Sequence, residues 1–131
     1  MRPTSVTHRD VFYLIDGEQK PILMVVTLTW LPQFPHTVTI QFGTKKKPEW
    51  VIGRQLLADG LEGHVGGYDI TIRPSLDKSW IELHLDSPTG HAEFLVYRQP
   101  IIEFLEATWA QIPAHEELVP TDEELQRLTS Y

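Results

Sequence analysis

Histidine is the residue type in this sequence with the best chemistry for a metal site, and there are six of them. None of the six shows the HxH, HxxxH or HExxH spacing that brings two ligands together on one element. The six are His8, His36, His64, His84, His91 and His115. Only His84 and His91 could face each other across a hairpin, and a zinc site needs three or four ligands. The sequence therefore predicts no metal site and no cofactor.

Nucleophilic and acid–base chemistry have equally little support. There is no cysteine, which removes disulfides, thiolate metal sites and cysteine nucleophiles together. There is no G-x-S-x-G, P-loop or Rossmann fingerprint, and the glycines from Gly60 to Gly67 lack the lysine and following helix that phosphate binding requires. The carboxylates in 116–117 and 122–124 lie in a polar segment, where solvation and charge repulsion explain them better than acid–base catalysis does. We therefore predict no catalytic residue and no enzymatic activity.

Binding of single-stranded nucleic acid is the alternative function that the residue types allow. Aromatic side chains on predicted strands could stack on bases. They are Phe12, Tyr13, Trp30, Phe42, Trp50, Tyr68 and Trp80. The only basic run is Lys45, Lys46 and Lys47, which also suits a solvated turn. The net charge of −7 repels phosphate, and aromatic residues in a small β-domain usually fill its core, so nucleic acid is not the expected partner.

The elements that would position these residues are mostly strands. Period-two alternation and β-branched runs predict strands within 11–15, 22–30, 36–42, 50–52, 68–73, 80–85 and 92–97. The apolar spacing changes after Gly53, which predicts a short helix over 54–59, followed by a glycine loop. A second helix is expected from Pro100 to Pro113. The sequence thus predicts an α+β fold, a mostly antiparallel sheet of six to seven strands with a C-terminal helix.

The whole chain, residues 1–131, is expected to form one domain. Residues 114–131 read as a polar tail with a short helix, because Thr121 and Glu124 have the spacing of a capping box. The N-terminus lacks the apolar core of a signal peptide. The longest apolar run, Pro21 to Pro32, is shorter than the roughly 20 residues that span a bilayer. We therefore expect a cytoplasmic protein without membrane insertion.

Three consecutive segments carry a family resemblance. They are VTIQFG at 38–43, WVIGRQLLADGL at 50–61 and GYDITIRPS at 67–75, followed by the hairpin WIELHLDSPTGHAEFLV and by PIIEFLEATWAQIP. Their order and short gaps resemble the SsgA-like proteins, which are actinobacterial regulators of cell division. The resemblance covers about residues 23 to 120. Gly53, Tyr68 and the three lysines depart from the family pattern and leave the subtype open.

The resemblance implies a non-enzymatic adaptor that acts in septum-site selection and recruits the division machinery during sporulation. Its implied partners are the machinery associated with the tubulin-like protein FtsZ, or another SsgA-like protein. It also implies a Whirly-like single domain that assembles into homo-oligomers, with a trimer as the family's example. A cytoplasmic protein recruited to division septa would fit this role.

Within the matched motif, Trp50, Arg54, Leu57 and Asp59 are the candidate partner-binding residues. Two roles stay open for Arg54. It can pair with a carboxylate inside the fold while Leu56 and Leu57 hold the helical turn against the core, or it can contact a partner directly. We favour the structural role for Arg54.

Overall fold

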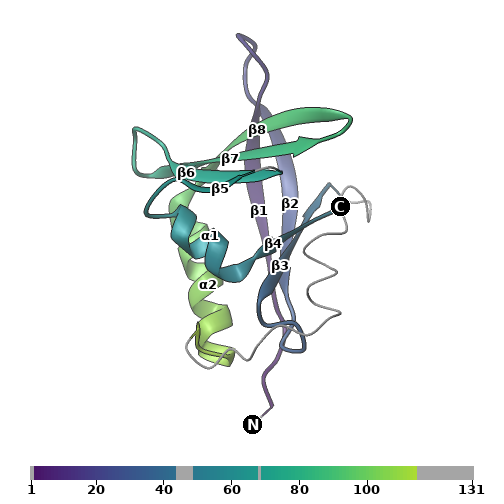
Figure 1. Ribbon diagram of the computed structural model, residues 1–131, viewed down its shortest axis with the longest axis vertical. Coiled ribbons are helices and arrows are strands. Elements are labelled where there is room, and N and C mark those ends of the chain that lie inside the picture. The colour runs from purple at the N-terminus through teal and green to yellow at the C-terminus, as the bar shows by residue number, and fades with distance from the viewer. Residues whose placement is uncertain (1, 44–48, 68, 115–131) are drawn as a thin grey trace.

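The computed structural model of the chain describes residues 2–43, 49–67 and 69–114. Within these residues the chain forms a mostly antiparallel sheet and two helices (Figure 1). The elements are β1 (Val6–Ile15), β2 (Ile22–Trp30), β3 (Thr37–Phe42), β4 (Glu49–Gly53), α1 (Arg54–Gly60), β5 (Val65–Gly67), β6 (Ile70–Pro74), β7 (Trp80–Ser87), β8 (Gly90–Tyr97) and α2 (Arg98–Gln111). The predicted α+β class with a C-terminal helix is confirmed.

The strands form one sheet in the order β4-β3-β2-β1-β8-β7-β6-β5, and each neighbouring pair is antiparallel. Strand β1 joins the two halves. It pairs with β2 from Val6 to Leu14, but with β8 only from Phe12 to Ile15. In Figure 1, β1 and β2 run vertically while β7 and β8 lie across them. The sheet therefore curls into a half-barrel.

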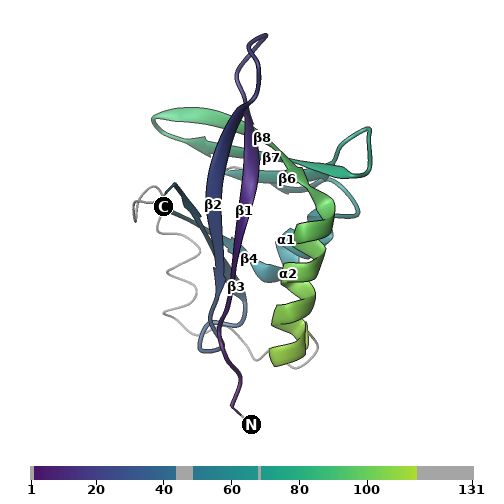
Figure 2. The ribbon, with the colours of Figure 1, turned by 180° about the vertical axis from the view of Figure 1, so that it is seen from behind.

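The concave, inner face of this sheet carries the core. Phe12, Val26, Leu28 and Ile40 are at most 2% exposed and come from alternate positions of three adjacent strands. Burying each such side chain contributes about 1.5 to 3 kcal/mol. Both helices lie on this side of the sheet, with α2 against β1 and α1 against β4, β5 and β6 (Figures 1 and 2). One face of the sheet is thus covered by the described helices, and the other is not.

The predicted number of strands was wrong, because the described residues contain eight rather than six to seven. The additional strand β5 lies in the stretch predicted as a glycine loop. Two of its three residues are glycine, which hides a strand in the sequence, and Gly66 has a φ of +99°. Among the described strands, β5 lies at the edge of the sheet and pairs with β6 alone.

Two element boundaries also differ from the prediction. Strand β1 starts at Val6 rather than near Val11, because its first half alternates polar residues that carry little apolar signal. Helix α2 starts at Arg98, so Pro100 is its third residue. Proline fits there because the first N–H groups of a helix have no acceptor within the helix. The predicted short helix over 54–59 corresponds to α1.

Some predictions fall outside the described residues. These are the three-lysine turn, Tyr68 and the short helix within 121–128. Of the aromatic residues expected in the core, Phe12, Trp30 and Phe42 are buried. Across the described part of the chain, neither helix is long and apolar enough to cross a membrane.

Gly60 provides a test of how closely α1 packs on the sheet. A Cβ at this position would lie 2.6 Å from Ile72 Cβ on β6 and closer still to Ile72 Cγ2. Although alanine is favoured over glycine within helices by about 1 kcal/mol, we expect Gly60→Ala to destabilise the fold by about 1 to 3 kcal/mol through overpacking. Urea unfolding measures this change. Gly63→Ala is the control, because its Cβ would meet nothing within 4 Å; equal effects of both substitutions would contradict the packing argument.

Candidate functional site

Arg54 is the candidate residue that the fold buries most completely, with 0% of its surface exposed. It is the first residue of α1, directly after β4, and its backbone N–H donates to the carbonyl of His36 at 2.8 Å. The guanidinium Nη1 donates to Thr108 Oγ1 on α2 at 3.3 Å. The guanidinium carbon also lies 5.4 Å from the centre of the Trp30 ring on β2. Arg54 therefore links β2, α1 and α2 inside the molecule.

The other three candidate residues of this motif divide between the core and the surface. Leu57 is 4% exposed and belongs to the core. Asp59 is exposed and accepts a hydrogen bond from Gln55 Nε2 at 2.8 Å, within α1. Trp50 is half-buried and lines an open groove. The burial of Arg54 and Leu57 favours the structural role, while a partner contact through Trp50 and Asp59 stays a prediction.

The groove beside Trp50 lies on the inner face of the half-barrel and has a volume of about 320 Å³. Its lining is mainly apolar and comes from six strands. It includes Leu14, Met24, Phe42, Trp50, Leu85 and Phe94. With few polar groups to orient a small molecule, this groove offers apolar contact rather than catalysis.

The outer face of the sheet carries a second apolar surface, which the sequence analysis did not identify. We call it the outer apolar face. Its residues are Val11, Tyr13, Leu23, Val25, Trp80, Leu95 and Tyr97, which occupy facing positions on β1, β2, β7 and β8. Leu23 is 57% exposed and Tyr97 is 44% exposed. Because the water-facing side of an antiparallel sheet is normally polar, this face is a candidate protein-binding surface.

Three aromatic rings hold part of the outer apolar face in a fixed arrangement. Trp80 and Tyr97 stack with their ring centres 3.8 Å apart. Tyr13 packs edge-on against both, at 5.6 Å from Trp80 and 6.3 Å from Tyr97. Ring pairs in such geometries add about 0.5 to 1.5 kcal/mol each beyond the area that they bury. A partner would meet a rigid aromatic surface here.

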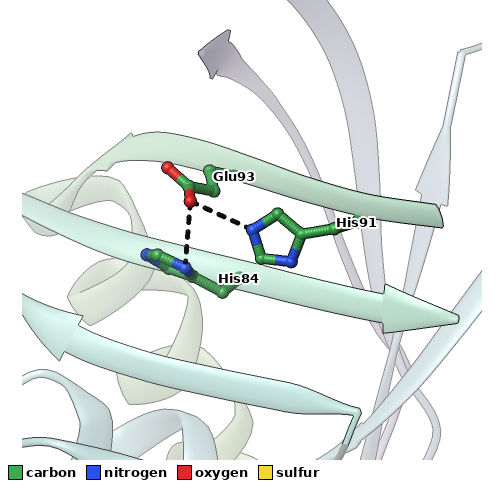
Figure 3. Close-up of side chains that lie close together, drawn as sticks. All are labelled: His84, His91 and Glu93. Carbon is green, nitrogen blue, oxygen red and sulfur yellow. Dashed lines mark hydrogen bonds and ion pairs between the residues drawn. The ribbon is translucent and has the colours of Figure 1, made fainter. Parts of the chain in front are cut away.

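A polar cluster continues the outer face along the β7–β8 hairpin. His84 on β7 lies opposite Glu93 on β8, and Asp86 lies opposite His91. Glu93 Oε1 is 3.0 Å from His91 Nε2 and 3.7 Å from His84 Nδ1 (Figure 3). His84, His91 and Glu93 thus bring three potential ligand atoms within 4.8 Å of one another. The sequence analysis considered the two histidines as a pair but missed Glu93, which the register of the predicted hairpin would have placed opposite His84.

Electrostatic interactions in this cluster are strong enough to shift two pKa values. Hydrogen bonds to Glu93 and to Asp86 raise the pKa of His91 above its ordinary value. Burial raises the pKa of Glu82, but hydrogen bonds from Arg73 and His84, together with their charges, outweigh it and hold that pKa below the usual range. The cluster therefore favours cationic groups among its carboxylates.

The pKa of the Asp10 carboxyl group is shifted upward, in the direction opposite to that of Glu82. Burial raises its pKa, and the backbone hydrogen bond from Val11 and the charge of His8 oppose that rise only in part. Its Oδ1 accepts from the Val11 N–H at 2.7 Å, while the buried Oδ2 has no hydrogen-bond partner among the residues that the structure describes. Asp10 lies on the inner face of β1, opposite Val26. The folded chain thus disfavours the ionised form of Asp10.

The chain matches a known protein family. The family model described as Streptomyces sporulation and cell division protein, SsgA, matches residues 24–117. A sporulation-specific cell division protein SsgB from Saccharopolyspora erythraea is 38% identical over 135 residues, which cover 98% of this chain and 96% of that protein. An SsgB protein from Thermobifida fusca is 31% identical and covers 87% of this chain and 86% of its own length.

Solved structures agree with these matches. One is described by the statement that mutations in SsgB correlate to longitudinal cell division during sporulation of Streptomyces coelicolor. It matches with a TM-score of 0.80 and 26% identity over 88% of this chain and 94% of that chain. An SsgA-like sporulation-specific cell division protein from Thermobifida fusca gives a TM-score of 0.79 and 30% identity, covering 88% of each chain. Sequence and fold therefore lead to the same family.

The structural role of Arg54 can be tested by substitution. We expect Arg54→Ala to destabilise the chain by about 2 to 5 kcal/mol, as large-to-small changes in cores do. Gln55→Ala, at the exposed next position, should change stability by no more than about 0.5 kcal/mol. Denaturant unfolding measures both. An Arg54→Ala variant with unchanged stability would mean that the buried guanidinium does not hold the three elements together.

The raised pKa of Asp10 predicts a pH-dependent effect of Asp10→Asn. The unfolded chain ionises Asp10 near pH 4, before the folded chain does, so ionisation of Asp10 lowers stability as the pH rises through the folded pKa. Asparagine keeps an acceptor for the Val11 N–H but never ionises. The stability of the variant relative to the native chain should therefore increase between about pH 4 and pH 7. The free energy of unfolding of both chains at both pH values measures this effect. A difference between the two chains that is the same at pH 4 and pH 7 would contradict the prediction.

Proposed function

Because the chain belongs to the SsgA family of sporulation and cell division proteins, we propose that it acts as a non-enzymatic adaptor in septation. It would work from the cytoplasm by binding other proteins at septum sites. The described residues contain no nucleophile, base and oxyanion-binding arrangement of the kind that a hydrolase or transferase needs. The described residues do form two apolar surfaces suited to protein contact, which are the inner groove and the outer apolar face.

The observation that carries this proposal is the outer apolar face. Tyrosine and tryptophan are the residues that interface cores favour, and here they form a fixed cluster with leucine and valine around it. The occupant that we propose is a second copy of this chain. Each copy carries a net charge of −7, so two copies repel at long range and need an apolar contact to associate. The outer apolar face supplies that contact on the side of the sheet that the described helices leave uncovered.

The resulting homo-oligomer would present several copies of the inner groove and of Asp59 to the division machinery. Presenting copies together raises the effective concentration of each weak contact, which suits a protein that gathers partners at one site. The trimer and the Whirly-like arrangement implied by the family resemblance belong to this proposal. The partner would be a component associated with FtsZ or another SsgA-like protein.

Single-stranded nucleic acid is the less favoured partner. The aromatic side chains of the outer apolar face share their side of the sheet with Glu82, Asp86 and Glu93. These carboxylates would repel the phosphates that must follow the stacked bases. The geometry therefore favours a protein over a nucleic acid on this face.

The test is a charge placed in the outer apolar face. Leu23→Glu should shift the native oligomer toward monomer, because the carboxylate would have to lose its water in the contact. Size-exclusion chromatography with light scattering gives the mass directly. Leu76→Glu is the matched control, since Leu76 is fully exposed and lies outside the sheet.

The same two variants test the cellular role. In a host that forms septa, folded Leu23→Glu should support septation poorly, while Leu76→Glu should support it normally. A monomeric native chain at high micromolar concentration, or an oligomer that Leu23→Glu leaves intact, would overturn the assembly through this face. If the Leu23→Glu variant is monomeric and still supports normal septation, assembly is not required for the cellular function.

A further inference from the structure

We propose that His84, His91 and Glu93 form a binding site for a zinc ion on the outer face of the β7–β8 hairpin. The ligand atoms would be His84 Nδ1, His91 Nε2 and Glu93 Oε1, which already converge (Figure 3). Two imidazole nitrogens and a carboxylate oxygen are a donor set that zinc accepts from proteins. Neither the family match nor the described relatives assign a metal to these residues.

The distances suit a tetrahedral ion. Zinc lies about 2.0 to 2.2 Å from nitrogen and oxygen ligands, so neighbouring ligand atoms in a tetrahedron are roughly 3.3 to 3.5 Å apart. Glu93 Oε1 is 3.0 Å from His91 Nε2 and 3.7 Å from His84 Nδ1, on either side of that range. All three atoms lie within 4.8 Å of one another. Small side-chain rotations would therefore be enough to place the ion.

The second nitrogen of each histidine is held by a carboxylate. His84 Nε2 lies 3.4 Å from Glu82 Oε1, and His91 Nδ1 lies 2.5 Å from Asp86 Oδ1. In metal sites a carboxylate on the outer ring nitrogen fixes the tautomer and directs the inner nitrogen at the ion. Both histidines of this cluster have a carboxylate on the outer ring nitrogen. Two surface histidines that were close only by chance would not be expected to share this arrangement.

The backbone supports the same geometry. His84 and Glu93 are directly opposite in the antiparallel register, as are Asp86 and His91, so the hairpin fixes the spacing of these side chains. Arg73 on β6 donates to Glu82 through Nε at 3.3 Å and Nη2 at 3.0 Å and holds that carboxylate in place. Along this hairpin the cluster holds the carboxylates of Glu82, Asp86 and Glu93, and Arg73 pairs with Glu82, so the local charge favours a cation.

The surface position leaves room for a further ligand. The side chains of His91 and Glu93 are each 46% exposed, while His84 is 18% exposed. Three protein ligands with one open position are typical of zinc sites that also bind water or an outside group. The site needs only one copy of the chain, so the inference does not rest on the proposed assembly.

Zinc binding to the full-length, metal-free chain tests the proposal. Isothermal titration with zinc chloride should show one ion for each chain. Zinc at about 100 times its dissociation constant should raise the melting temperature by roughly 5 to 10 °C, because only the folded hairpin assembles the ligands. Cobalt, used as a spectroscopic probe, should give the visible absorption of a tetrahedral site.

Substitutions locate the ion. His84→Ala and His91→Ala should each lower the zinc affinity at least tenfold, and Asp86→Asn should lower it about 10- to 100-fold through the orientation of His91. His64→Ala is the control, since His64 is exposed in a loop outside the cluster, and it should leave the affinity unchanged. Circular dichroism checks that each variant is folded.

The outcomes separate cleanly. Absence of stoichiometric binding, or binding that survives the combined substitution of His84 and His91, would overturn the site. Equal losses for His64→Ala and His91→Ala would also overturn it, because they would indicate nonspecific coordination by surface histidines. Binding should persist in the Leu23→Glu variant, and its loss there would place the ion between copies instead of within one hairpin.

Discussion

An eight-stranded sheet with two short helices has one face that these helices cannot cover, and this constraint organises the molecule. The inner face curls around α1 and α2 and buries the core residues that alternate along each strand. The outer face must then be either polar or covered by something else. It is polar along the end of the β7–β8 hairpin and apolar across the centre of the sheet, so the two regions require different partners.

Arg54 belongs to the inner side of this division. Burying a guanidinium costs free energy unless its N–H donors are hydrogen-bonded and its charge is compensated. Thr108 accepts one of these hydrogen bonds, and the Trp30 ring offsets part of the charge. Since these groups belong to α2 and β2, the arginine position is coupled to the packing of the last helix on the second strand. Arg54 and Leu57 are thus connections inside the fold, while Trp50 and Asp59 of the same motif remain accessible for contact.

The sequence was informative wherever apolar periodicity was strong. The alternation of Val38, Ile40 and Phe42 predicted β3, and the change of period after Gly53 predicted α1. It failed where local residue types oppose the structure adopted, as in glycine-rich β5 and the polar first half of β1. The burial of Arg54 depends on α2, which is about fifty residues away in the chain, so the sequence could offer only alternatives. The outer apolar face was missed because a strand with apolar residues on both sides reads as a fully buried strand.

The two proposals on the outer face are physically connected. Glu93 lies opposite Ile15 in the β1–β8 register, and Tyr13 two residues earlier lies opposite Leu95, so the carboxylates of the cluster adjoin the outer apolar face. Two copies that meet on this face would bring like charges close together, and an ion bound to His84, His91 and Glu93 would offset part of that repulsion. Any such effect is reciprocal, because a ligand that favours the assembled state must bind that state more tightly. Ion binding at the polar end of the outer face would then regulate the association of two copies through the outer apolar face.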